Sequence, residues 1–207
     1  MRESTGVRFK TVFLGKTPPD DERTDQLIYW TKRFDQLGLA PKSAGNLSFR
    51  TEKGFIITAT GVALRAADKE NLVEVLKVEI EPAQIVLRVK GKAIPSKESV
   101  LHSGIYDSRS EINAIFHIHD ELVVGLADEL RLPCTQGEQP RGSYELAKEV
   151  DRVLDLTEDT KYLVVRNHGI VAMGETLEEA GRLVEDMNKM ARKNKGREAE
   201  NEDNARI

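Results

Sequence analysis

Two histidines separated by a single residue are the first feature of this sequence that could carry chemistry. His117 and His119 lie in residues 112–119, a mostly apolar run that we interpret as a β-strand. Successive side chains of a strand point to opposite faces, so both imidazoles leave the same face and can share one ligand. His168 follows a second predicted strand, in a turn that contains Gly169. A third imidazole therefore converges on the pair if the two strands are neighbours.

Three imidazole nitrogens with one open position form the ligand set of a catalytic zinc, which polarises an oxygen of the substrate or of water. The spacing also has an ordinary explanation, because a His-x-His pair in a strand is more often a surface or core feature than a metal site. Cys134 is the only cysteine, which excludes a thiolate-rich metal site and an internal disulfide framework. Nitrogen and carboxylate ligands are what the chain can offer.

Glu98 is the nearest candidate carboxylate, as a metal ligand or as a base. It follows Pro95 near the start of a predicted helix over residues 96–108. A glutamate in the first turn of a helix needs no function, because the helix dipole favours it there. His102 lies four residues later on the same helical face, and we interpret it as a packed or hydrogen-bonded histidine.

Three short segments have the composition of an anion-binding turn. Residues 43–46, residues 58–61 and Ser96 offer small side chains, hydroxyls and free backbone N–H groups. Turns use the same residue types for purely conformational reasons, so each segment taken alone is more simply a turn.

Short β-rich runs alternate with amphipathic helices along the chain. Helices are predicted over residues 21–38, 96–108, 121–130 and 143–156, and a long one begins at a capping box formed by Thr176 and Glu179. Strands are predicted over residues 46–50, 55–60, 72–80, 84–89, 112–119, 162–166 and 170–173. A central mixed sheet flanked by helices is the simplest architecture that buries all the apolar faces.

The length and the charge balance limit the class of protein. The 207 residues suit one domain, and 31 basic against 35 acidic residues leave no positive surplus for nucleic-acid phosphates. No uncharged apolar stretch approaches the roughly 20 residues of a membrane span, and residues 1–10 contain no signal peptide. We therefore expect a cytoplasmic protein with neither nucleic-acid nor membrane partners. Residues 191–207 are almost wholly polar, which predicts a frayed helix end followed by a disordered tail.

Taken together and in order, these segments resemble the class II aldolase/adducin family. The matching segments are Gly45-Asn46-Leu47-Ser48, Ile57-Thr58-Ala59-Thr60-Gly61, Pro95-Ser96-Lys97-Glu98, His102, Ile105-Tyr106, Arg109, His117-Ile118-His119, Arg166-Asn167-His168-Gly169 and Gly174-Glu175-Thr176-Leu177-Glu178-Glu179-Ala180. Each motif is weak, but the ordered set covers about residues 21–190 and is specific. The resemblance makes the metal site the favoured hypothesis.

The resemblance implies a single three-layer α/β/α domain around a mostly antiparallel or mixed sheet. This domain would cover residues 21–190, between an N-terminal extension of residues 1–20 and the tail of residues 191–207. The family usually assembles as a homotetramer with active sites near the subunit boundaries.

The resemblance also implies a set of site residues. The three histidines matching His117, His119 and His168 hold zinc or another divalent metal, and Glu98 binds the metal at rest and becomes the base when substrate arrives. The phosphate pocket is lined by the residues matching Gly45, Asn46, Thr60, Gly61 and Ser96. Lys97 replaces a serine that is common at its position; it either adds a cation for a phosphate or carboxylate or simply faces solvent.

The second acid or base is expected at Glu138. By its spacing from His119, this residue falls where the fuculose-phosphate aldolases carry a tyrosine and the methylthioribulose-phosphate dehydratases carry a catalytic glutamate. No aromatic residue follows Tyr162, so the C-terminal tyrosine of the fuculose-phosphate aldolases is missing.

The function implied is a metal-dependent aldolase that cleaves or forms a C–C bond in a small phosphorylated ketose through a metal-stabilised enediolate. Two other reactions use a similar site: a dehydration, which Glu138 favours, and a 4-epimerisation of the ribulose-phosphate type. Glu98 favours the aldolase, because the dehydratases usually lack a carboxylate at that position. A non-catalytic adducin-like binding module is the alternative from another class, although a scaffold has no physical need for three converging imidazoles.

Overall fold

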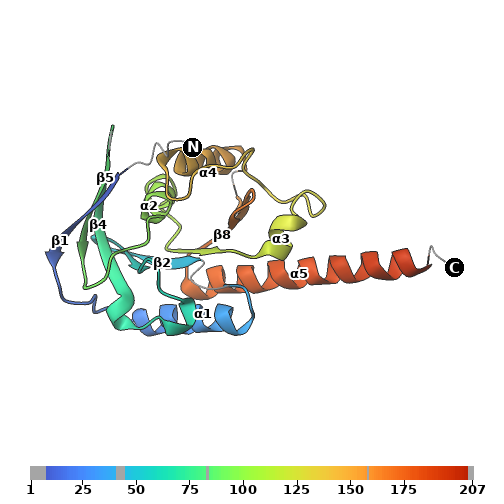
Figure 1. The fold of residues 1–207 in the computed structure, drawn as a ribbon, viewed down its shortest axis with the longest axis horizontal. Coiled ribbons are helices and arrows are strands. Elements are labelled where there is room, and N and C mark those ends of the chain that lie inside the picture. The colour runs from blue at the N-terminus through green and yellow to red at the C-terminus, as the bar shows by residue number, and fades with distance from the viewer. Residues whose placement is uncertain (1–7, 41–44, 83, 158, 205–207) are drawn as a thin grey trace, which may run out of the picture.

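An eight-stranded sheet lies between two layers of helices (Figure 1). The structure is a computed structural model that describes residues 8–40, 45–82, 84–157 and 159–204, with side chains up to residue 197. The strands are β1 (Arg8–Gly15), β2 (Asn46–Thr51), β3 (Gly54–Thr58), β4 (Leu72–Glu81), β5 (Gln84–Lys90), β6 (Ala114–Ile118), β7 (Tyr162–Val165) and β8 (Gly169–Gly174). The helices are α1 (Thr24–Gln36), α2 (Ser99–Ser108), α3 (Glu121–Gly125), α4 (Tyr144–Leu156) and α5 (Leu177–Asn204).

The strand order is β1-β5-β4-β3-β2-β6-β8-β7. β1 runs parallel to β5, and every other neighbouring pair is antiparallel. The expected α/β/α domain with a mixed, mostly antiparallel sheet is therefore confirmed. β6 lies between β2 and β8, and Asn46 of β2 pairs with His117 of β6. This register places His117 on a central strand of the sheet, with a paired strand on either side.

The two faces of the sheet bury separate apolar cores. Helices α1 and α5 cover one face, where Trp30 and Phe34 pack against Phe116 of β6. Helices α2 and α4 cover the other face, which includes Ile115 of β6. Burying one such large apolar side chain contributes about 1.5–3 kcal/mol. Alternation along β6 therefore directs His117 to the face that α2 and α4 cover.

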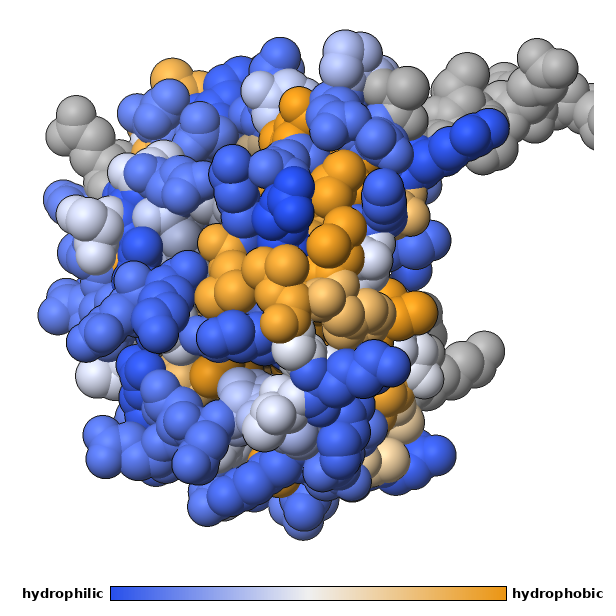
Figure 2. All heavy atoms as spheres, turned by 90° about the vertical axis from the view of Figure 1, so that its left-hand side faces the viewer, coloured by the Kyte–Doolittle hydropathy of each residue, from blue (hydrophilic) through white to orange (hydrophobic). Residues whose placement is uncertain are grey.

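Strand β1 lies within residues 1–20, where the sequence predicted only an extension. Its apolar residues do not alternate regularly, since Phe13 and Leu14 are adjacent and both exposed. The strand is ordered by backbone pairing to β5 at the sheet edge, which a local sequence pattern cannot reveal. Figure 2 looks at this end of the molecule and shows apolar residues gathered on its surface.

Two helices differ in length from the predicted ones. α3 ends at Gly125, although the apolar periodicity predicted a helix over residues 121–130; glycine lowers helix stability, and the chain continues in turns. α5 continues to Asn204, well into residues 191–207. Alanine, arginine, lysine and glutamate, which dominate there, are good helix formers even without a core to pack on. Within the described residues, no helix combines the length and the apolar character needed to cross a membrane.

Candidate metal centre

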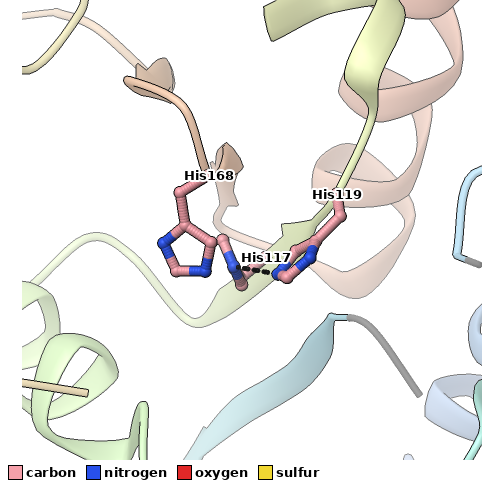
Figure 3. Close-up of side chains that lie close together, drawn as sticks. All are labelled: His117, His119 and His168. Atoms are coloured by element: carbon pink, nitrogen blue, oxygen red, sulfur yellow. Dashed lines mark hydrogen bonds between the residues drawn. The ribbon is translucent and has the colours of Figure 1, made fainter. Parts of the chain in front are cut away.

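Three histidines and one glutamate meet where β6, the β7–β8 turn and the start of α2 come together. His117 lies in β6 and His119 directly after it, while His168 lies in the turn between β7 and β8. Ile118 pairs with Ile170 across β6 and β8, so the turn is held beside the end of β6. The strand before His168, β7, is not a neighbour of β6, so the condition stated from the sequence is not met in that form; the imidazoles converge because β8, which begins at Gly169, pairs with β6. Figure 3 shows the three imidazoles pointing toward one another.

The backbone of the β7–β8 turn explains how His168 comes so close to β6. Asn167 has a φ of 57°, a left-handed conformation that asparagine tolerates better than most residues. A Cβ atom at Gly169 would lie 2.6 Å from the Ile118 carbonyl oxygen and 2.9 Å from His117 Cε1. Gly169 is therefore required by the close packing of the turn on β6, and Asn167 suits the left-handed conformation of the turn.

The side-chain atoms are close enough to act on one centre. One possible ligand atom from each histidine lies within 4.8 Å of the others, and His119 Nε2 is 3.0 Å from His117 Nε2. Glu98 bridges two of the rings: its Oε2 lies 3.2 Å from His117 Nε2, and its Oε1 lies 3.2 Å from His168 Nε2. His117, His168 and Glu98 are buried, and His119 is partly exposed. The cluster therefore has one side accessible from solvent.

Further hydrogen bonds orient the ligands. His117 Nδ1 donates to the Ile170 carbonyl oxygen at 2.9 Å, which leaves Nε2 as the nitrogen directed at the cluster. Asn46 Nδ2 donates to Glu98 Oε2 at 2.6 Å, and Ser96 Oγ accepts from the Glu98 N–H at 3.2 Å. Asn46 of β2 thus orients the carboxylate, and Ser96 fixes the backbone of Glu98.

The electrostatics favour neutral imidazoles and an ionised carboxylate. Burial lowers the pKa of His117, and burial together with the neighbouring histidines lowers the pKa of His119 to about 3. Burial alone would raise the pKa of Glu98, but the attraction of His117 and His168 and the bond from Asn46 outweigh it and hold this pKa below its usual range. These are the protonation states in which histidine and glutamate bind a metal.

Unpaired nitrogen atoms in the cluster fit a divalent cation. His168 Nδ1 is buried and has no hydrogen-bond partner among the described residues, while the buried Nε2 lies 3.2 Å from Glu98 Oε1, at an ion-pair distance but not in hydrogen-bond geometry. Leaving buried polar atoms unpaired is costly, and a cation that takes up their lone pairs offsets the cost. Nitrogen ligands with one carboxylate suit zinc and similar divalent ions. The buried triad of His117, His119 and His168 is therefore consistent with a divalent metal site.

Comparison with known proteins decides the family. Residues 25–194 match the Class II Aldolase and Adducin N-terminal domain. The chain belongs to the class II aldolase and adducin family. It is 26% identical over 190 residues to the L-fuculose phosphate aldolase of Haemophilus influenzae, which covers 82% of this chain and 81% of the relative. It is 27% identical over 176 residues to the 5-methylthioribulose-1-phosphate/5-deoxyribulose-1-phosphate aldolase of Escherichia coli, covering 75% of each chain. A solved L-fuculose 1-phosphate aldolase matches with a TM-score of 0.69 at 24% identity, over 84% of this chain and 85% of that one.

Within this class II aldolase fold, the expected phosphate-pocket residues lie in two adjacent places. Asn46 and Ser96 contact Glu98, and Gly45, with a φ of 93°, approaches the His117 carbonyl oxygen so closely that a Cβ would lie 2.7 Å from it. Thr60 and Gly61 are exposed in a turn joined to the segment before Ser96, because the Thr60 N–H donates to the Ile94 carbonyl oxygen. Of the nest predicted at residues 43–46, Ser43 and Ala44 lie outside the described residues. The phosphate role of all five residues stays a prediction.

Lys97 and Glu138 are exposed side chains that are not bonded to the histidine cluster in the part of the chain that the structure describes. Lys97 is exposed, and its ammonium group lies 5.7 Å from the ring centre of Phe9. Glu138 is exposed in the loop before α4. Among the described residues, no hydrogen bond or ion pair links either side chain to the cluster. Their substrate-binding and catalytic roles stay predictions.

Two residues near the cluster have no place in the sequence motifs. Arg141, in the same loop as Glu138, lies close enough for its charge to contribute to the lowered pKa of His117 and His119. Asp120, which follows His119, is buried and accepts from the Val123 N–H and from Asn188 Nδ2 of α5 at 2.7 Å. The position of Asp120 before a predicted helix was a capping signal. Nothing in the local sequence marks Arg141.

Proposed function

We propose that this chain is a metal-dependent aldolase that cleaves or forms a C–C bond in a small phosphorylated ketose. The observation that supports this most strongly is the convergence of three buried or half-buried imidazoles, two of which lie within 3.2 Å of the Glu98 carboxylate. The two named relatives above are both sugar-phosphate aldolases, which supports the substrate class. A binding module without chemistry has no use for unpaired buried imidazole nitrogens.

In this proposal His117, His119 and His168 hold the cation, with Glu98 as a fourth ligand before substrate binds. A zinc or other divalent ion held there supplies a Lewis acid that stabilises negative charge developing on the carbonyl oxygen of a ketose. The Nδ1–H of His117, fixed by the Ile170 carbonyl oxygen, keeps the ring from rotating as charge changes.

Glu98 carries the proton at the carbon next to the ketose carbonyl. Its carboxylate is ionised in the free protein and lies within 3.2 Å of two imidazole nitrogens. As a fourth ligand, the carboxylate would be engaged before substrate binds. Substrate that displaces it would free its oxygens to accept the proton from the neighbouring carbon.

The phosphate group is bound mainly through neutral donors. Asn46 and Ser96 lie beside Glu98, and the turn with Thr60 and Gly61 adds the Thr60 hydroxyl and the Gly61 N–H, since the Thr60 N–H is bonded to the Ile94 carbonyl oxygen. Lys97, the residue before Glu98, adds positive charge at the edge of this pocket. Such a pocket binds a phosphate through directed hydrogen bonds, as helix N-termini and nests do.

Glu138 is proposed as the second acid or base, acting at the hydroxyl oxygen whose proton moves as the C–C bond breaks. The charge of Arg141 acts on His117 and His119, so the end of this loop lies near the cluster. A glutamate in this loop also suits removal of water from the substrate. Dehydration of a methylthioribulose-type phosphate is therefore the second candidate reaction.

A substrate screen of the zinc-loaded protein tests the proposal. Dihydroxyacetone phosphate is offered with several aldehydes, and ketose 1-phosphates are offered in the cleavage direction. Formation or cleavage of a C–C bond supports the aldolase, and release of water without C–C cleavage supports the dehydratase. Absence of both reactions in a protein that also binds no metal would leave only the binding module. The double variant His117→Ala with His119→Ala is the control for contaminating activity.

A further inference from the structure

A buried chain of hydrogen bonds lies beneath the metal centre, and the proposed reaction does not use it. His102 Nδ1 of α2 lies 2.7 Å from Ser48 Oγ of β2, and the same Ser48 oxygen lies 2.8 Å from the hydroxyl of Tyr106. His102 and Ser48 are fully buried, and Tyr106 is nearly so. The three side chains therefore depend on one another for their hydrogen bonds.

The direction of these bonds follows from counting unpaired groups. If Tyr106 donates to Ser48 and Ser48 donates to His102 Nδ1, the proton of the neutral imidazole lies on Nε2 and one buried group, Nε2–H, stays unpaired. If His102 Nδ1 instead donates to Ser48 and Ser48 donates to Tyr106, two groups have no partner among the described residues: His102 Nε2 and the Tyr106 hydroxyl proton. The first direction is favoured because each unpaired buried group costs stability.

These hydrogen bonds connect α2, whose N-cap residue is Glu98, to β2, which contains Asn46. Asn46 and Ser48 are two residues apart on β2 and share one face of the sheet, whereas Glu98 and His102 are one turn apart at the start of α2. Asn46 bonds to Glu98 at 2.6 Å, and Ser48 bonds to His102 at 2.7 Å. Two parallel side-chain pairs thus set the distance between α2 and β2.

Packing alone does not explain an imidazole at position 102. The ring stacks on Phe55, with ring centres 6.5 Å apart and an angle of 22° between the planes, which a phenyl ring could do equally well. A phenyl ring would also avoid the unpaired Nε2. The group that only the imidazole supplies is Nδ1, which is used to bind Ser48.

We propose that Ser48, His102 and Tyr106 are positioning residues for the Glu98 carboxylate. They hold the first turn of α2 at the separation from β2 at which Glu98 reaches both His117 and His168. This inference rests on the proposed metal-dependent function. Weakening the hydrogen bonds among Ser48, His102 and Tyr106 therefore changes the geometry of the metal ligands, although no ligand is removed.

Cobalt(II) loading tests the inference without an activity assay, because the visible absorption of protein-bound Co²⁺ reports ligand geometry. Ser48→Ala removes the link to His102, and we expect a shifted Co²⁺ spectrum and roughly 10-fold weaker Co²⁺ binding, the size expected when support of a metal ligand is lost. Tyr106→Phe keeps the bond between Ser48 and His102 but removes the hydroxyl that orients Ser48. We therefore expect a spectral shift in the same direction as for Ser48→Ala, but a smaller one. Ser103→Ala, on the same helix but bonded only to exposed Asp107, is the matched control and keeps the spectrum of the unmodified chain.

The outcomes separate this inference from the proposed function. A folded Ser48→Ala protein with the spectrum and Co²⁺ affinity of the unmodified chain overturns the positioning role. If Ser48→Ala fails to fold, as judged by circular dichroism, Tyr106→Phe decides by the same criterion. An unmodified chain that binds no Co²⁺ refutes the metal centre and the inference together, whereas normal Co²⁺ binding with unchanged variants refutes the inference alone.

Discussion

Replacing Gly169 by alanine should disable the metal centre although no ligand is substituted. The added methyl group would lie 2.6 Å from the Ile118 carbonyl oxygen and 2.9 Å from His117 Cε1, whereas ordinary contacts begin at 3.4 Å. One of the two strands must therefore move by about 0.8 Å at this point. The obstacle is the β6 backbone on one side and a ligand ring on the other, so no flexible side chain can absorb the change.

The size of the effect follows from where the movement occurs. Overpacking a close contact costs about 1–3 kcal/mol of folding stability. His168 precedes the substituted residue, so its ring is displaced from His117 and Glu98 together with the turn. Because loss of support for a metal ligand weakens binding by roughly 10–100-fold, we expect zinc affinity to fall by at least that much.

Zinc affinity can be measured by competition with a chromophoric chelator, and stability by thermal unfolding of the metal-free protein. Gly125→Ala is the matched control, because a Cβ there meets nothing within 4 Å and the backbone is helical. This control should bind zinc normally and be equally or more stable. Unchanged zinc affinity and unfolding temperature in Gly169→Ala would refute the argument that glycine is required for convergence of the histidines.

Three further predictions concern the cluster itself. Glu98→Gln should fold but lose exchange of the proton on the carbon next to the ketose carbonyl by at least about 100-fold, measured by NMR in D₂O, and unchanged exchange would remove Glu98 as the base. His117→Ala combined with His119→Ala should lose about one metal ion per chain in elemental analysis, so equal metal content would disprove the site. The metal-free protein should lose stability as the pH falls from about 6.5 toward 3. Burial lowers the pKa of both His102 and His119 to about 3 in the folded protein. The unfolded chain therefore binds more protons in this range, which favours unfolding. The slope is about 1.4 kcal/mol per pH unit for each such histidine, and unfolding temperatures that stay constant over this range would contradict it.

The sequence could predict the parts of the fold that depend on local patterns. The β2–β3 hairpin, β4, β5 and α4 lie close to their predicted ranges because each has an apolar periodicity of its own. The capping box also forms, with the Glu179 N–H donating to Thr176 Oγ1, although the Glu179 carboxylate accepts from the N–H one residue before the cap. β1 could not be predicted, because only its distant partner β5 orders it.

The candidate site divides in the same way. His117 and His119 were predicted to share a face because strand geometry is local, and Gly169 beside His168 indicated a tight turn. The position of Glu98 between two rings could not be derived from spacing, because it depends on how α2 docks on β2 through pairs such as Ser48 with His102. The resemblance to a family supplied what the local pattern could not.

We propose that the loop before α4 sets the choice of reaction. The histidines, Glu98 and their supports are set by strands and helices, which leave little freedom for side-chain exchange. Glu138 and Arg141 instead lie in a loop anchored at Gly142, whose φ of 70° and close approach to the Lys97 backbone bring the loop beside Glu98. Loops fixed at one end by a rigid scaffold can change residues at low cost to folding. We therefore expect the residue at position 138 to decide which substrate oxygen exchanges a proton, while the histidines and Glu98 serve the step that the three candidate reactions, aldol cleavage, epimerisation and dehydration, have in common.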